Sequence, residues 1–87
     1  GQIQIHIDNY TTKEQEITLY DISFDSAEDA SIPPSFVSEM DGEYTKLWKF
    51  TLAAGESFEV TYHGEGGGLI QMQGVAENLK VEVDLDV

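Results

Sequence analysis

Leu79-Lys80-Val81-Glu82-Val83-Asp84-Leu85-Asp86-Val87, the last stretch of the chain, alternates between apolar and charged side chains throughout. A repeat of two residues is typical of a β-strand with one face in a hydrophobic core and the other in water. The hydrated side of this strand is almost entirely carboxylate. The sequence therefore indicates an acidic β domain that is half exposed to solvent.

Shorter runs with the same alternation precede this strand. They span residues 3–7, 44–52, 58–62 and 69–75, and are separated by turn-forming residues. Residues 36–40 are expected to form a short edge segment or a turn of helix, because the preceding Pro33-Pro34 cannot sit in a central strand.

Residues 14–24 form a run in which the apolar positions change phase. Ile17 and Leu19 share one face, whereas Tyr20 and Ile22 share the other. Such a change predicts a β-bulge, or a strand that crosses from one sheet to another.

Six or seven strands without a helical period favour an all-β fold, in which two antiparallel sheets pack face to face. We expect residues 1–87 to form a single immunoglobulin-like β-sandwich domain, with a small closed barrel as the alternative. Trp48 is expected in the core, since it alternates with Phe50 and Leu52.

Charge is the strongest constraint on function. Seventeen Asp and Glu face four Lys and no Arg, which gives a formal net charge of −13. Because phosphate binding depends on Lys and Arg, we expect neither direct nucleic-acid binding nor attachment to anionic lipid. The acidic surface serves solubility or docks a basic partner. The chain has no cysteine and no visible signal peptide or membrane span, which favours a cytoplasmic location, with an extracellular one as the alternative.

The residues suited to chemistry are scattered. His6 and His63 are expected on the surface, without the spacing of a metal or catalytic motif. Gly64–Gly68 is expected to be a hairpin loop rather than a phosphate cradle, because no G-K-[ST] sequence follows it. Oxygen ligands for calcium could come from acidic loop residues, although an EF-hand pattern is absent. These residues are Asp25, Glu28, Asp29, Asp41 and Glu43. We therefore predict no catalytic, cofactor-binding or metal-binding residue and no cofactor.

Three features suggest contact surfaces instead. Lys46 and Lys49 flank the tryptophan and could form a small cationic island. Exposed strand edges can accept a strand from a partner; the first and last strands and the Pro33-Pro34 loop are the candidates. Exposed aromatic contacts are expected from Tyr10, Tyr20 and Tyr44.

Two parts of the chain carry a family resemblance. The first is residues 47–62, a strand, a turn with Gly55-Glu56 and a strand ending in Tyr62; the second is residues 3–19, two short strands around an Asn-containing turn. Together with residues 20–23 and 69–78, they resemble the C-terminal immunoglobulin-like domain of the B subunit of archaeal DNA topoisomerase VI. In that family the ATPase and strand-passage residues lie in other domains, so no functional residue is carried over.

The resemblance implies a non-catalytic accessory domain of a larger, ATP-dependent enzyme that changes DNA topology. We expect such a domain to bind a protein partner and to be monomeric in isolation. One alternative is an extracellular or cell-surface adhesion or stalk module of the same architecture. Another is an acidic calcium- or sugar-binding β-sandwich.

Overall fold

The computed structural model describes residues 1–64, 68–74 and 79–86, and within them the chain forms seven strands and no helix. The strands are β1 (Gln2–Asn9), β2 (Gln15–Ser23), β3 (Phe36–Met40), β4 (Glu43–Leu52), β5 (Ser57–His63), β6 (Leu69–Gln73) and β7 (Leu79–Asp86).

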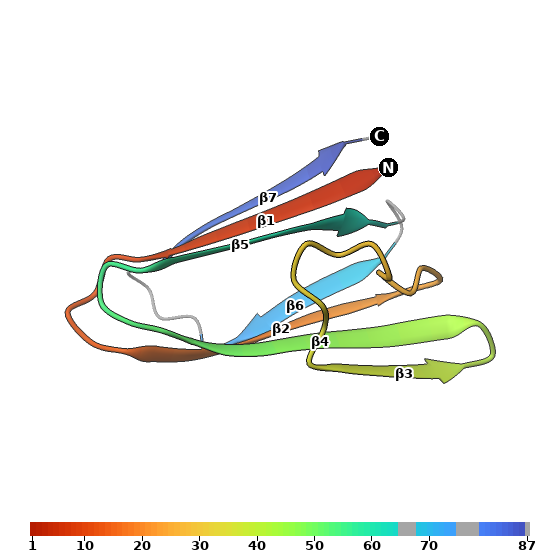
Figure 1. Ribbon diagram of the computed structural model, residues 1–87, viewed down its shortest axis with the longest axis horizontal. Helices are drawn as coiled ribbons and strands as arrows, with labels where there is room; N and C mark the ends of the chain where they lie inside the picture. The colour runs from red at the N-terminus through yellow and green to blue at the C-terminus, as the bar shows by residue number, and fades with distance from the viewer. Residues whose placement is uncertain (65–67, 75–78, 87) are drawn as a thin grey trace.

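These strands form two antiparallel sheets packed as two layers (Figure 1). One sheet has the order β5-β1-β7 and the other the order β3-β4-β2-β6. The expected two-sheet sandwich is therefore confirmed. The strands are divided differently from those of constant-type immunoglobulin domains, in which the first, second, fourth and fifth strands share one sheet. The likeness to immunoglobulin domains is one of architecture rather than of strand order.

The core lies between the sheets and is built from the alternate positions of their central strands. Trp48 of β4 packs on Tyr62 of β5, with ring centroids 5.1 Å apart, and Phe50 stacks on Phe58 at 3.8 Å. Both contacts join the two sheets. The predicted core position of Trp48 is confirmed, since only 1% of its surface is exposed. The buried hydrophobic residues are Ile3, Ile5, Ile7, Ile17, Leu19, Ala27, Trp48, Leu52, Phe58, Val60 and Tyr62.

The predicted phase change in β2 is wrong. The strand pairs with β4 without interruption from Gln15 to Ser23, and its buried positions continue in the same phase through Asp21 and Ser23. Polar side chains thus occupy core positions, while the apolar Tyr20 lies on the outer face. Because the second half of β2 has polar residues on its inner face and apolar ones on its outer face, its sequence pattern resembles that of a bulged strand.

The predicted hairpin at Gly64–Gly68 is also wrong, because β5 pairs with β1 whereas β6 pairs with β2 in the other sheet. Residues 65–67 lie outside the described residues. Residues 36–40 form an edge strand, β3, which is one of the two expected forms, and β3 joins β4 through a tight turn at Asp41 and Gly42. Both turn residues have positive φ, 53° and 83°, which is the geometry of a type I′ hairpin.

The C-terminal strand, β7, pairs with β1 along its length but lies at the edge of its sheet. Val83 is opposite the fully buried Ile5, yet 40% of its surface is exposed. An edge strand has a neighbour on one side only, so Val83 is less well covered than Ile5 of β1.

Residues 24–35 link β2 to β3 and lie against both layers (Figure 1). The Trp48 indole Nε1 donates a hydrogen bond to the Ile32 carbonyl at 2.7 Å. The Ser31 amide donates to the Thr61 carbonyl at 2.9 Å, and the Thr61 amide donates to Ser31 Oγ at 2.9 Å. This segment therefore covers part of the outer edge of β5.

Candidate interaction surface

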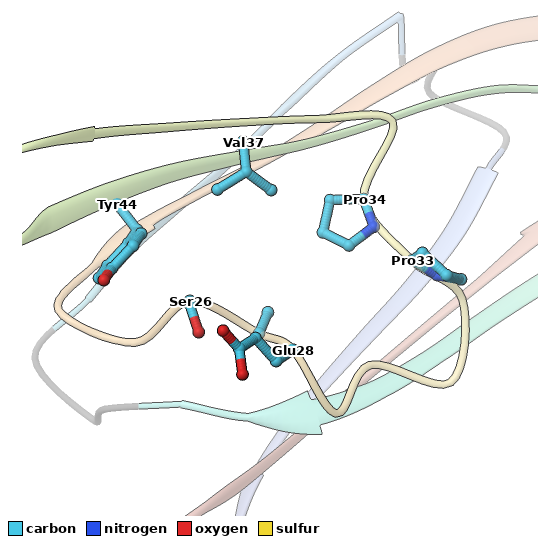
Figure 2. A pocket seen from close by; sticks show the side chains of 7 residues that line it. Ser26, Glu28, Pro33, Pro34, Val37 and Tyr44 are labelled. Carbon is cyan, nitrogen blue, oxygen red and sulfur yellow. The ribbon is translucent and has the colours of Figure 1, made fainter.

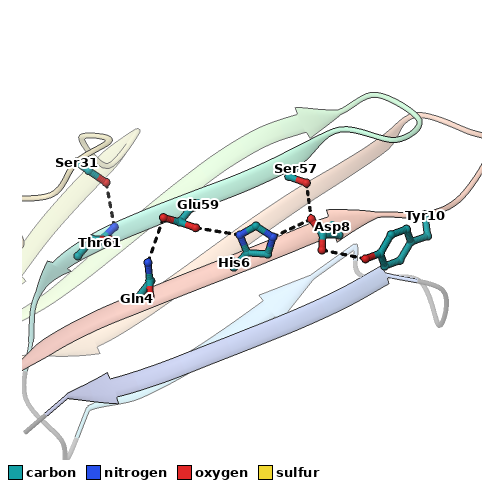
Figure 3. Close-up of polar contacts among 8 residues, drawn as sticks. All are labelled: Gln4, His6, Asp8, Tyr10, Ser31, Ser57, Glu59 and Thr61. Carbon is teal, nitrogen blue, oxygen red and sulfur yellow. Dashed lines mark hydrogen bonds and ion pairs between the residues drawn. The ribbon is translucent and has the colours of Figure 1, made fainter.

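His6 lies on the outer face of β1 and is held between two carboxylates (Figure 3). Its Nδ1 lies 3.0 Å from Glu59 Oε2, and its Nε2 lies 2.8 Å from Asp8 Oδ1. The hydrogen bond to Glu59, followed by that to Asp8, raises the pKa of His6 above its ordinary 6.5. With both ring nitrogens engaged, the imidazole ring joins β1 to β5 and offers no free nitrogen to a substrate.

Ser57 is close to this histidine but is placed wrongly for nucleophilic catalysis. Its hydroxyl donates to Asp8 Oδ1 rather than to the imidazole, so the serine and the histidine do not form a nucleophile–base pair (Figure 3). That hydrogen bond lowers the pKa of Asp8 below its ordinary value of 3.8, and the bond to His6 adds to the effect. His63 is exposed on β5, and its amide donates to Asp29 Oδ1 at 3.1 Å.

The acidic loop residues proposed as calcium ligands do not gather. In the described ranges, no group of three or more His, Asp or Glu side chains is arranged to hold a metal ion. Asp29 accepts from the β5 backbone, Asp41 lies in the β3–β4 turn, and Glu28 lines a pocket beside the β3–β4 hairpin.

A buried ion pair is the polar feature that the sequence interpretation missed. Lys46 is completely buried, and its Nζ lies 2.9 Å from Asp21 Oδ1 on the neighbouring strand. The same ammonium donates hydrogen bonds to Ser23 Oγ at 2.6 Å and to the Asp25 carbonyl. Its contact with Asp21 Oδ1 is an ion pair without a hydrogen bond. Tyr62, from the opposite sheet, donates to Asp21 Oδ2, and burial together with this bond raises the pKa of the phenol.

The predicted cationic island at Lys46 and Lys49 is therefore wrong, because only Lys49 is on the surface. A signal was available: Lys46 has the same strand parity as Trp48, and Asp21 has the parity of Leu19. Polar residues at both core positions of paired strands indicate an ion pair rather than two solvated faces.

The structure contains a pocket of about 340 Å³ between residues 26–34 and the β3–β4 hairpin (Figure 2). Its lining residues are Ser26, Ala27, Glu28, Pro33, Pro34, Val37 and Tyr44. Pro34 and Val37 form an apolar wall, and the Glu28 carboxylate lies across the hollow from them (Figure 2). This volume is at the lower end of the range for ligand pockets.

Large apolar side chains also lie on the outer face of the four-stranded sheet. Phe36 is opposite Leu47, which is opposite Tyr20, and Leu69 is opposite Ile22. Directly opposed residues point to the same face of a sheet. Met40 lies on the same face of β3 as Phe36, beyond Ser38. We call these six residues the outer patch; Phe36, Met40 and Leu69 are 58%, 76% and 51% exposed.

The structure places only some of the predicted contact residues on accessible surface. The first strand is not an available edge, because β1 is paired on both sides, whereas β7 is an edge strand and Pro33-Pro34 lines the pocket. Tyr10 is 66% exposed, whereas Tyr20 and Tyr44 are half-buried, in the outer patch and the pocket respectively.

Comparison with known families identifies a match to residues 1–83. The matching family is described as the C-terminal domain of the B subunit of type 2 DNA topoisomerase 6. The match covers nearly the whole chain and agrees with the resemblance found in the sequence. Neither the curated proteins nor the solved structures give a significant match.

Proposed function

The chain belongs to the family of C-terminal domains from the B subunit of type 2 DNA topoisomerase 6, and on that premise we propose that it is a non-catalytic accessory domain that binds a protein partner. Its work is recruitment or regulation of the enzyme, and it acts in the cytoplasm, where the enzyme has access to DNA. Family membership does not favour the alternative of a cell-surface adhesion module.

The outer patch is the observation that carries the proposal. Six apolar or aromatic residues from all four strands of one sheet point away from the core. Several large apolar side chains exposed on one sheet face favour a protein contact, since water would otherwise hydrate them at a free-energy cost. The net charge of −13 supports a protein partner over DNA, because like charges would repel the phosphate backbone.

No helix long and apolar enough to cross a bilayer occurs in the residues that the structure describes. The polar network around His6 supports a structural role for this histidine, because its ring nitrogens and the Ser57 hydroxyl are all engaged with carboxylates. We therefore assign the chemistry of strand passage to other parts of the enzyme.

The test uses the full B subunit in the assembled topoisomerase. Deletion of the segment corresponding to residues 1–87 should leave ATP hydrolysis and relaxation of supercoiled DNA in place, while altering regulation or partner recruitment. A matched variant keeps the domain but carries Phe36→Ser, Met40→Ser and Leu69→Ser; it should reproduce the effect of the deletion. Loss of ATP hydrolysis on deletion would contradict the proposal, as would tight binding of duplex DNA by the domain at about 0.15 M salt.

A further inference from the structure

We propose that β3 accepts an extended segment of a protein partner as an added strand, and that this segment places an apolar side chain in the pocket beside Val37 and a basic side chain opposite Glu39. The inference rests on the proposed function, and it names the site and the class of partner.

The backbone of β3 is suited to strand addition. Within the described residues, β3 has β4 on one side and no strand on the other, and all five of its residues are exposed. An exposed edge presents N–H and C=O groups that can pair with another chain. The edge of β5 is different, because Ser31 already bonds to its Thr61 backbone.

The side chains of β3 give the edge two distinct faces. Phe36 and Met40 belong to the outer patch, whereas Val37 lies opposite Lys46 and therefore points toward the inner face, where it lines the pocket. Val37 is 44% exposed although it is part of that wall. An added strand would cover both faces at once, since its side chains alternate as those of β3 do.

The charges around the edge select a basic partner. Glu28 lines the pocket, Glu39 lies on β3, and Asp41 and Glu43 follow in the hairpin. The closest lysine in the pairing, Lys46, cannot neutralise them, because its ammonium is buried and paired with Asp21 in the core. Carboxylates on the rim of an apolar site attract cationic chains and raise their rate of association.

The residues of β3 define the sequence pattern that a paired partner strand should have. A strand running antiparallel to β3 would place apolar residues opposite Met40, Val37 and Phe36, a basic residue opposite Glu39, and a small polar residue opposite Ser38. Read in the partner's own direction, this is apolar, basic, small polar, apolar, apolar. A five-residue strand buries less surface than a standard protein interface, so the contact would be transient.

The probe is the capped peptide Lys-Leu-Lys-Thr-Val-Leu-Lys, which contains this pattern, titrated into the isotope-labelled chain at about 0.15 M salt. Backbone amide resonances of residues 36–40 and 44 should shift and saturate. Replacing the lysine that faces Glu39 by glutamate should weaken binding roughly threefold to tenfold. N-methylation of alternate peptide amides, which removes donors without changing the side chains, should abolish binding.

Val37→Lys should reduce the affinity at least about tenfold, because an inward-pointing charge on an edge strand blocks addition. The matched control is Val83→Lys on the edge of β7, which changes the net charge equally and should bind as the original chain does. Shifts centred on β6 or β7, shifts spread over the acidic surface, or equal behaviour of the two lysine variants would overturn the inference.

The two proposals fail separately. If deletion of the domain from the B subunit alters recruitment or regulation but Val37→Lys in that subunit does not, only the β3 site is wrong. If deletion changes neither, the accessory binding role itself is wrong.

Discussion

Replacing Lys46 by methionine should remove a large part of the stability of the domain. Methionine fills a similar volume, but Asp21, which is only 1% exposed, then remains as an unpaired buried carboxylate, while Ser23 Oγ loses a donor. Breaking a buried ion pair by removing one partner costs about 3–5 kcal/mol. A chain of this length has a total unfolding free energy of only about 4–13 kcal/mol. The midpoint of thermal unfolding should therefore fall by more than about 12 °C.

Urea unfolding followed by the fluorescence of Trp48 measures this effect directly. The chain has a single tryptophan, and it is 1% exposed in the native state, so its emission reports exposure of the core. Lys49→Met is the matched control: Lys49 is exposed on the same strand, and its loss should change the unfolding free energy by less than about 0.5 kcal/mol.

A double-mutant cycle separates the ion pair from side-chain packing. Asp21→Asn keeps an acceptor for Tyr62 but removes the charge. The double variant Asp21→Asn with Lys46→Met should lose at least about 1 kcal/mol less than the sum of the two single losses, because each single variant leaves one charge buried alone. Additive losses, or a loss below about 1 kcal/mol for Lys46→Met, would refute this account of the core.

Three further perturbations test other parts of the fold. Gly74→Ala should cost more than about 2 kcal/mol of unfolding free energy, because a Cβ at φ 84° would lie 2.1 Å from the Glu16 carbonyl oxygen. The control, Gly42→Ala, has φ 83° but open space around it and should cost only about 1–2 kcal/mol. Equal losses in urea unfolding would contradict the steric argument. The raised pKa of His6 stabilises the fold fully below pH 6.5, and this contribution is lost as the pH rises through the folded-state value. His6→Gln should abolish that part of the pH dependence of the unfolding free energy. An unchanged profile would show that the pKa of His6 is the same in the folded and unfolded states. The raised pKa of Tyr62 predicts that the unfolding free energy falls above pH 10, where the phenol ionises in the unfolded chain. Tyr62→Phe should lose about 1.5–3 kcal/mol of unfolding free energy at pH 7, because the hydrogen bond to Asp21 is removed. In unfolding followed by circular dichroism, this variant should not show the alkaline decline.

Periodicity predicted most of the strands, because β1, β2, β4 and β5 bury alternate positions. The edge strand β3 has no buried position, and the sequence left it open between a strand and a turn of helix. Residues 44–52 alternate around Trp48 and form β4 with almost the same bounds. Pairing was harder to predict, because alternation records which face is buried and not which strand lies alongside. Residues 57–63 and 69–73 are neighbours in sequence and were therefore expected to form a hairpin, yet they pair with β1 and β2 in different sheets.

In the pocket, likewise, residues marked by a local sequence pattern were predicted, whereas residues brought in by tertiary packing were not. Pro33-Pro34 was a contact candidate in the sequence, and it does line the pocket. The parts of the lining that Val37 and Tyr44 supply could not be foreseen, because they depend on how the β3–β4 hairpin folds back toward residues 26–28. The pocket is therefore a product of tertiary packing.

The buried ion pair and the pocket are physically connected. Lys46 lies opposite Val37 in the pairing of β4 with β3, and its ammonium donates to the Asp25 carbonyl, just before the loop of residues 26–34 that lines the pocket. Trp48 donates to the Ile32 carbonyl just before the two prolines. This loop is thus tied at two points to buried side chains of one strand, which fixes its backbone without an occupant. A site held in its binding shape loses less entropy when a partner arrives. The core lysine thus acts at the surface indirectly, by holding the edge strand and the loop at a separation into which a side chain can enter.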